Sequence, residues 1–360
     1  MTSTDPDAGS PGGSTANASV AAPDDTVPPR ARVFSGMKPT DGVLHLGNYL
    51  GALRGWVAHQ DERDSVFCVV DLHALTIPEA VDPAELRSTT RAIAALYFAC
   101  GLDPERNVVF VQSHLTEHAE CTWILNCVTP LGWLHRMTQF KAQAEARESV
   151  GSGLLTYPVL QAADILLYDT EVVPVGEDQV QHIELTRDIA VRFNRLFGDT
   201  FVLPRAVVPK AAARVMGLDD PSAKMSKSIA AERAGHAIGL LDSPAVLKKA
   251  IMSAVTDSGR ETRFDHASPG VRNLLTIYQV LADENVQQVE ERFAGEGYGT
   301  LKKAVLEVVV ETLTPIQARY AELMRDPAEL DAILARGAEQ ARAMAAPTLA
   351  RVKAAVGVGA

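Results

Sequence analysis

Four short runs of β-forming residues alternate with helical stretches, and this alternation constrains the fold more than any other feature of the chain. The runs are Val33–Ser35, Ser65–Asp71, Asn107–Ser113 and Val172–Val175. The second run, SVFCVVD, is apolar almost throughout, as expected of a parallel strand that is buried on both faces. Strands that alternate with helices predict an α/β fold with a parallel sheet and right-handed crossovers.

Helix signals fill the gaps between these strands. Asp82 and Pro83 are residue types that begin helices, and Gly101 is a typical residue at a helix end. Two further helices are predicted at Glu117–Val128 and Leu131–Ser149, from the same signals and from hydrophobic spacing.

From about residue 243 the strand signals stop, and amphipathic helices of mixed charge follow. The preceding segment, Leu203–Met216, contains two prolines and several basic residues and is expected to be irregular. A helical bundle without a ligand and an RNA-binding appendage both fit the helical part, because periodicity does not distinguish them. The helices are expected at Ser243–Ala254, Val271–Ala282, Val286–Phe293, Tyr298–Met324 and Pro327–Val356.

Residues 1–31 differ in composition from the rest of the chain. They contain five prolines and no aromatic residue, so they cannot bury a core and are predicted to be a disordered tail. They also lack the apolar stretch of a signal peptide, and no run approaches the roughly 18 apolar residues of a membrane span. Neither export nor a membrane partner is expected.

The four cysteines, Cys68, Cys100, Cys121 and Cys127, include no C-x-x-C pair. We expect buried, reduced thiols in a cytoplasmic protein, with a metal or cluster site as the alternative. The formal net charge of −11 argues against indiscriminate binding of nucleic acids. DNA is therefore not an expected partner, while a local basic face for one RNA stays open.

The stretch from Arg32 to Arg54 combines a short strand, turn residues and the start of a helix. His45, Gly47 and Asn48 stand at that helix start. The first N–H groups of a helix have no partner within it and the helix dipole favours negative charge, so the arrangement suits the phosphates of a nucleotide. An ordinary strand–turn–helix unit in which Asn48 caps the helix is the alternative.

The apolar segment Leu154–Tyr168 contains one charged residue, Asp164. Its side chain shares one predicted helix face with Tyr157, Gln161 and Tyr168, because the spacings are four, three and four. A carboxylate in apolar surroundings needs a hydrogen-bond donor. A ligand N–H is one candidate, and a protein donor or a solvated helix edge is the other.

Two later loops carry polar groups. Gly176, Glu177 and Asp178 lie between a predicted strand and a helix, where α/β sheets bind ligands, and Asp178 suits either ribose hydroxyls or a helix cap. The sequence AKMSKS, Ala223–Ser228, contains two lysines and two serines. It fits a mobile clamp on polyphosphate or a solvated basic loop.

The patterns H-x-G-N near the start of the sheet and K-M-S-K-S after it together resemble the two signatures of class I aminoacyl-tRNA synthetases. Outside these two signatures, the sequence from about Arg32 to the C-terminus is similar to that of the tryptophanyl-tRNA synthetase family. The matching segments are Phe34–Gly36, Asn48–Leu53, Met137–Lys141, Gly176–Gln179 with Gln181 and His182, Ser253–Ser258, Glu311–Leu313 and Pro315–Gln317.

The resemblance implies a Rossmann-like parallel-sheet catalytic domain at 32–218 and an all-helical domain at 219–360. The helical domain would bind the tRNA and its anticodon, with its last helices packed back on the catalytic domain. In the implied reaction ATP activates L-tryptophan as tryptophanyl-adenylate with release of pyrophosphate, and tryptophan then passes to the 2′-hydroxyl at the 3′ end of tRNA(Trp). The implied partners are L-tryptophan, ATP with Mg²⁺, tRNA(Trp) and a second copy in a cytoplasmic homodimer.

The same resemblance assigns roles to individual residues. Lys224, Lys227, His45 and Asn48 are expected to be catalytic. The ATP site is expected to contain Lys38, Pro39, Thr40, His45, Gly47, Asn48, Gly176, Glu177, Asp178, Val215, Lys224, Met225, Ser226, Lys227 and Ser228. The tryptophan site is expected to contain Asp164 as acceptor of the indole N–H, Tyr157 and Gln179 at the amino-acid backbone, and Phe34 and Gln161. No metal ligand is expected among the side chains.

Three positions depart from the family pattern. Lys38 stands where many members carry Gln, and Asp41 is an additional residue in the same turn. Gln161 stands where family members commonly have a Met that lines the indole pocket. This makes the sequence around Gln161 more similar to that of tyrosyl-tRNA synthetases. Gln143 replaces the second of two lysines, of which Lys141 remains, and Lys38 is a candidate to compensate for the missing cation. Tyrosine specificity and a non-catalytic tryptophan- or tRNA-binding paralogue are the alternative functions.

Overall fold

The structure, a computed structural model, describes residues 28, 30–39, 44–145, 147–208, 214–226, 229–230, 233 and 235–359. Almost all of the tail predicted at 1–31 lies outside the described residues. So do four residues of the predicted turn and loop: Thr40, Asp41, Lys227 and Ser228.

Five parallel strands form one sheet in the order β3-β2-β1-β4-β5. β1 and β2 pair over their whole length, from Arg32 opposite Asp64 to Met37 opposite Val69. This sheet confirms the predicted α/β class. The strand order reverses between β1 and β4, and in open α/β sheets ligands bind beyond the carboxyl ends of the strands at such a point. The strands are β1 (Arg32–Met37), β2 (Asp64–Val69), β3 (Val108–Val111), β4 (Val172–Pro174) and β5 (Arg205–Val207).

The fifth strand corrects the prediction that Leu203–Met216 is irregular throughout. β5 lies within this segment and pairs with β4 from Arg205 to Val207. Three residues after a proline give almost no periodicity, so the pairing depends on β4 as a template and not on a local pattern.

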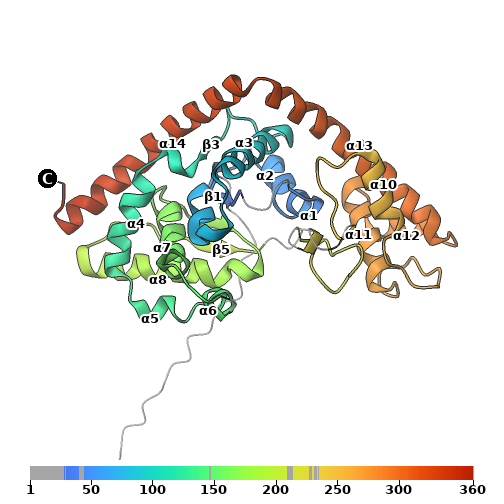
Figure 1. The fold of residues 1–360 in the computed structure, drawn as a ribbon, viewed down its shortest axis with the longest axis horizontal. Coiled ribbons are helices and arrows are strands. Elements are labelled where there is room, and N and C mark those ends of the chain that lie inside the picture. Colours follow the sequence, from blue (N-terminus) through green and yellow to red (C-terminus); the bar gives the residue numbers. More distant parts are fainter. Residues whose placement is uncertain are drawn as a thin grey trace, which may run out of the picture.

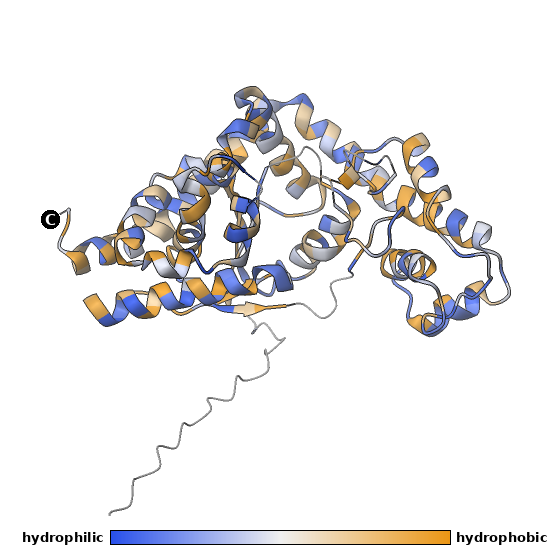
Figure 2. Ribbon diagram, turned by 60° about the horizontal axis from the view of Figure 1, so that its bottom comes forward, coloured by the Kyte–Doolittle hydropathy of each residue, from blue (hydrophilic) through white to orange (hydrophobic). Residues whose placement is uncertain are grey.

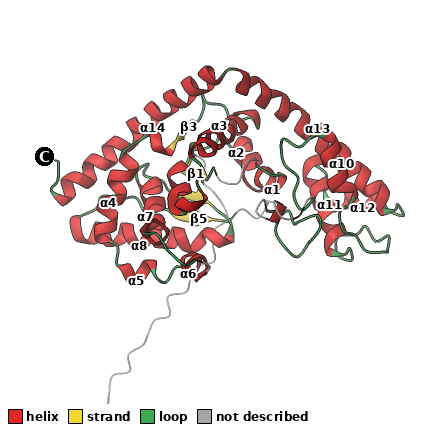
Figure 3. Cartoon of the chain, in the orientation of Figure 1, coloured by secondary structure: helices red, strands yellow, loops and turns green. Residues whose placement is uncertain are grey.

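Helices connect and cover the strands (Figure 3). The helix predicted from Asp82 and Pro83 is present as α3, and the Asp82 carboxylate accepts hydrogen bonds of 2.8 Å from two backbone N–H groups of its first turn. Gly101 follows it with a φ of 109°, which favours glycine. The helices of the sheet region are α1 (Leu46–Asn48), α2 (Arg54–Ala58), α3 (Pro83–Ala99), α4 (Glu117–Val128), α5 (Leu131–Leu134), α6 (Thr138–Glu145), α7 (Ser152–Leu166) and α8 (Val180–Phe197).

The helix predicted at Leu131–Ser149 is wrong as one element, because the chain turns between α5 and α6. Met137 enters the core at this turn and is 2% exposed. The Thr138 side chain and backbone N–H both donate to Gln181 of α8, over 2.9 and 3.2 Å. These contacts with distant residues redirect the chain, and local sequence does not reveal them.

The C-terminal part is helical, as predicted, and its two longest helices form an arm along one side of the molecule (Figure 1). α13 packs on α10 and α11, whereas α14 returns over β3 and α4. A Cβ atom on Gly337 of α14 would lie 1.9 Å from the Val109 carbonyl oxygen, so the helix touches the β3 backbone directly. These helices are α10 (Pro244–Met252), α11 (Pro269–Ala282), α12 (Val286–Phe293), α13 (Tyr298–Arg325) and α14 (Pro327–Val356).

Each face of the sheet has its own hydrophobic core. Phe67 and Val69 of β2 pack with α3 and the C-terminal helices, whereas Val66 and Cys68 of the same strand pack with α4, α7, α8 and α14. Hydrophobic and hydrophilic bands alternate along the covering helices (Figure 2). No helix in the described part of the chain is both long and apolar enough to cross a membrane.

Three of the four cysteines are buried and unpaired, as predicted, but Cys127 is exposed. Cys121 and Leu125 lie on the buried face of α4. Cys127 lies six residues after Cys121 and therefore points away from that face.

Candidate functional site

The first signature begins α1, beyond the carboxyl end of β1. His45 is the N-cap residue: its Nδ1 accepts a hydrogen bond from the Asn48 N–H over 3.3 Å, and the Asn48 Oδ1 accepts one from the His45 N–H over 3.0 Å. This reciprocal capping box fixes both side chains at the helix start. The cap is therefore His45, where the sequence suggested Asn48.

The second signature lies on a short antiparallel pair of segments, residues 215–217 and 223–225, which we call the signature hairpin. Met216 pairs with Lys224, and backbone hydrogen bonds of 2.9 and 3.1 Å flank this pair. The Lys224 side chain is exposed, and Ser226 is half-buried just after the hairpin. Lys227 and Ser228 follow outside the described residues, as does Thr40 of the first loop, so their predicted roles are not tested.

The two signatures lie against each other. A Cβ atom on Gly47 would lie 3.6 Å from the Met225 Cβ and 3.0 Å from the His45 ring. Met225 is 1% exposed and shares a core cluster with Leu46. The structure thus brings the described residues of both signatures together.

Two other residues of the predicted ATP site, Val215 and Pro39, are buried. Val215 is 2% exposed and turned into the core, so any contact with adenine would come from its backbone. Pro39 is buried, and Lys38 beside it is exposed.

The third segment of the predicted ATP site follows β4. Gly176 leads into a 3₁₀ turn, Glu177–Gln179, and a Cβ atom on Gly176 would lie 2.8 Å from the Asp178 Oδ1. The Gln179 Nε2 donates to the other Asp178 oxygen over 2.9 Å. Since the strand order reverses between β1 and β4, this turn and the first signature flank the crevice in which such sheets bind ligands.

Asp164 is buried in α7 at 1% exposure and receives four hydrogen-bond contacts from protein groups. Its Oδ1 lies 2.7 Å from both the Gln112 Nε2 and the His118 Nδ1. Its Oδ2 lies 2.8 Å from the Gln112 Nε2 and 2.9 Å from the His73 Nε2. Of the alternatives left open by the sequence, the donor in this structure is therefore protein.

Burial alone would raise the pKa of Asp164, but hydrogen bonds from His118 and His73 and the charges of both rings lower it to about 2. The carboxylate is therefore ionised at neutral pH. A carboxylate offers about four lone-pair positions, and the four contacts occupy them. A ligand N–H can therefore bind Asp164 only if it replaces one of these contacts. Gln112 contacts both carboxylate oxygens, so it can give up one of them.

Tyr157 is fixed by a second hydrogen-bonded chain. Its hydroxyl lies 2.8 Å from the His182 Nε2 and donates to the Gln139 Oε1 over 3.1 Å. Burial lowers the pKa of His182 to about 4, so the ring is neutral and donates its one N–H to the Tyr157 oxygen. Burial also raises the pKa of Tyr157 to about 12, so the hydroxyl keeps its proton.

The remaining predicted tryptophan residues lie around this network. Phe34 is 4% exposed and stacks on Tyr168, with ring centroids 5.6 Å apart, and the Tyr168 hydroxyl bonds the His118 Nε2 over 2.8 Å. Gln161 is half-buried on α7, between Tyr157 and Asp164 in sequence. The predicted side chains of α7 and β1 therefore surround one buried acid.

Three residues of this network were not predicted from the sequence: His73, Gln112 and His118. His73 and Gln112 follow β2 and β3 within a few residues. Carboxyl ends of neighbouring parallel strands meet at one edge of a sheet, so polar residues within or just after the last residues of two predicted strands were the available signal.

Comparison with known proteins places this geometry in a family. The family model for class I tRNA synthetases (W and Y) matches residues 28–314. The tryptophan–tRNA ligase 2 of Streptomyces avermitilis is 52% identical over 325 residues, which cover 89% of this chain and 95% of that protein. The tryptophan–tRNA ligase of Caldanaerobacter subterraneus is 52% identical over 328 residues, which cover 91% of this chain and 98% of that protein.

Solved structures agree with the sequence matches. The tryptophanyl-tRNA synthetase of Mycoplasma pneumoniae superposes with a TM-score of 0.83 at 36% identity, covering 92% of this chain and 98% of that one. The Campylobacter jejuni enzyme in complex with ADP and tryptophan gives a TM-score of 0.79 at 36% identity, covering 91% of this chain and all of that one. The chain therefore belongs to the class I tRNA synthetases of the tryptophan and tyrosine type, within the family of tryptophan–tRNA ligases.

Proposed function

We propose that this chain activates L-tryptophan with ATP and transfers it to tRNA(Trp). The tryptophan carboxylate attacks the α-phosphorus of ATP and the bond to pyrophosphate breaks. The adenylate then acylates the 2′-hydroxyl of the terminal ribose, and AMP leaves. The contact of Gly47 with Met225 carries this proposal, because it joins the two nucleotide-binding signatures beside one crevice. Such a reaction needs in-line positioning and positive charge on the leaving phosphates.

ATP would lie across the reversal point of the sheet. His45, Gly47 and Asn48 hold the phosphates at the start of α1, where the helix dipole favours a negative charge. Gly176, Glu177 and Asp178 hold the adenosine, and Lys224 adds positive charge from the signature hairpin. Mg²⁺ would enter this arrangement with the nucleotide, carried on the phosphate oxygens.

Tryptophan would lie beside the Asp164 network. The indole N–H takes a place on the Asp164 carboxylate that Gln112 occupies here, while Tyr157 and Gln179 hold the amino-acid backbone. A ligand without a donor at this position cannot replace the Gln112 contact, so the acid favours a ring that carries an N–H there. The two ligases that are 52% identical support the same choice.

Amino-acid-dependent exchange of pyrophosphate into ATP tests the function directly. We expect exchange with tryptophan and little with tyrosine. Exchange with tyrosine alone would assign the chain to the sibling specificity. Absence of exchange with either amino acid, in protein that binds tryptophan, would identify a non-catalytic paralogue.

The assembly and the place of action belong to the same proposal. We propose a homodimer in the cytoplasm. The dimer is supported by the exposed apolar surface of α4 and α5, where Trp123 is 71% and Leu131 64% exposed. The helical region at 219–360 would bind tRNA(Trp) and its anticodon.

A further inference from the structure

The signature hairpin has two outer edges whose backbone groups are satisfied by side chains from outside it. Met216 and Lys224 lie opposite each other on the two segments. The backbone hydrogen bonds between the segments are made by the residues before and after them. The N–H and C=O groups of Met216 and Lys224 therefore point outwards, away from the opposite segment. Groups that hold these outer edges therefore fix the position of the whole hairpin.

Asn273 of α11 holds the first edge. Its Oδ1 accepts a hydrogen bond from the Met216 N–H over 2.9 Å, and its Nδ2 donates to the Met216 carbonyl over 2.9 Å. The residue is 4% exposed. Its amide thus completes one side of the hairpin as a neighbouring strand would, from a helix 57 residues further along the chain.

His236 holds the second edge. Its fully buried ring places Nε2 3.3 Å from the Lys224 carbonyl oxygen and Nδ1 2.5 Å from an Asp219 oxygen. The ring thus lies between a carboxylate and a backbone carbonyl, both of which accept hydrogen bonds. A Cβ atom on Gly217 would lie 2.2 Å from the ring, which therefore packs directly on the hairpin backbone.

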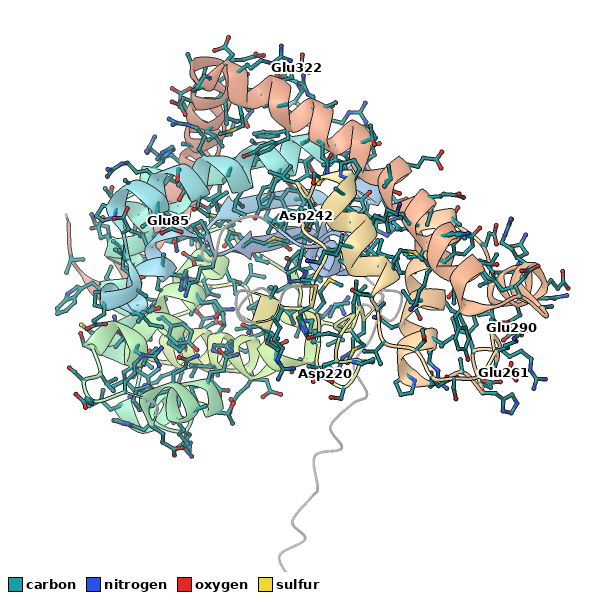
Figure 4. All side chains as sticks on the ribbon, turned by 45° about the vertical axis from the view of Figure 1, so that its right-hand side comes forward. Glu85, Asp220, Asp242, Glu261, Glu290 and Glu322 are labelled. Atoms are coloured by element: carbon teal, nitrogen blue, oxygen red, sulfur yellow. The ribbon has the colours of Figure 1, made fainter. Side chains whose placement is uncertain are left out.

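The same segment continues to the first signature. Ile238 accepts a hydrogen bond from the Leu46 N–H over 2.8 Å, and Leu240 donates one to the Leu44 carbonyl over 2.9 Å. Asp220 and Asp242, labelled in Figure 4, lie on either side of this segment in the sequence. The segment therefore connects the edge of the hairpin at Lys224 with the start of α1.

We infer that Asn273 and His236 are positioning residues for the activation step, which rests on the function proposed above. They hold the signature hairpin against the first signature so that Lys224 faces the phosphates of ATP. Both act through the backbone of Met216 and Lys224, to which their side chains are hydrogen-bonded.

Asn273→Asp tests the first contact. The variant keeps the acceptor for the Met216 N–H and the size of the side chain, but it replaces the donor to the Met216 carbonyl with a charged acceptor. We expect the kcat of tryptophan-dependent exchange to fall about tenfold or more and the KM for ATP to rise, while the KM for tryptophan stays within about twofold. Asn285→Asp is the matched control, because Asn285 caps α12 and Asp caps equally well.

His236→Asn and His236→Gln test the second contact. The amide nitrogen of Gln reaches about as far as Nε2 and can still donate to the Lys224 carbonyl, whereas that of Asn reaches only as far as Nδ1 and serves Asp219. We expect His236→Asn to show the losses of Asn273→Asp and His236→Gln to recover most of the rate. A merely structural role would give both variants the same defect.

Thermal unfolding and direct tryptophan binding accompany each assay. Normal kcat and ATP KM in Asn273→Asp and His236→Asn would overturn the inference, as would equal losses of tryptophan and ATP binding. If His236→Asn does not fold, Asn273→Asp decides alone. A wild-type chain without tryptophan-dependent exchange would instead overturn the proposed function, so the two failures are distinguishable.

Discussion

Asp164 makes the acid stability of this protein sensitive to a single carboxylate. Its folded pKa of about 2 lies below the ordinary value of 3.8, so its contribution to stability is present above pH 4 and is lost as the pH falls towards 2. We expect the free energy of unfolding to decrease by about 2 kcal/mol over this interval because of Asp164. Urea unfolding of wild type and Asp164→Asn at several pH values measures it, and an equal pH slope in both proteins would contradict it.

Gln143 stands where the family pattern has a lysine near the leaving pyrophosphate, so another cation is needed to replace its charge. The structure offers Arg147, whose Nη1 donates to the Gln143 Oε1 over 2.7 Å. We expect Arg147→Gln to slow pyrophosphate exchange about tenfold, because a cation near the leaving phosphates is lost. Lys38→Gln tests the other candidate, and Arg195→Gln, at the far end of α8, is the control. A wild-type rate in Lys38→Gln would refute compensation by Lys38, and one in Arg147→Gln would refute Arg147.

The residues of the site differ in how far sequence could predict them. Asp164 and Tyr157 stood out because one helix carries them at helical spacing. His73, Gln112 and His118 come from three separate elements, and only the folded sheet brings them to the same carboxylate. Polar residues at the ends of two predicted strands point to His73 and Gln112, but no local pattern shows that all three side chains meet one carboxylate.

At the scale of elements, local chemistry predicted those segments whose ends carry their own signals. Helix α3 begins at the predicted Asp82–Pro83 pair. Helices α4, α12 and α14 begin and end at the predicted residues. The turn between α5 and α6 was missed because Gln181, more than forty residues away, binds Thr138. β5 was missed because three residues carry too little pattern.

Gly337 lets helix α14 approach the backbone of strand β3, because it has no Cβ atom. A Cβ atom would overlap the Val109 carbonyl oxygen, so Gly337→Ala forces the helix away from the sheet. We expect the free energy of unfolding to fall by about 1–3 kcal/mol, with a lower Tm. Gly299→Ala in α13 is the control, because nothing lies within 4 Å of its Cβ position and alanine favours the helix. An equal Tm in the two variants would show that α14 tolerates the displacement.

At the scale of the whole molecule, the exposed apolar surface of α4 and α5 is our candidate for the interface of the proposed homodimer. Trp123 exposes 71% of its surface, although a tryptophan on a monomer is usually covered by its own chain. Covering such apolar surface with a second copy removes it from water, which favours association. We therefore expect wild type to have twice the mass of one chain and Trp123→Asp to be a monomer, because a carboxylate at the interface would be buried without a partner.

Light scattering after size-exclusion chromatography measures both masses. Val246→Asp is the matched control, since Val246 is a 50% exposed apolar residue on α10, in the helical part of the chain. The control should stay dimeric, and all three proteins should have similar circular dichroism. If Trp123→Asp also stays dimeric, the contact lies on another face of the molecule. A monomeric wild type at micromolar concentration would remove the homodimer from the proposed function without touching the chemistry of the site.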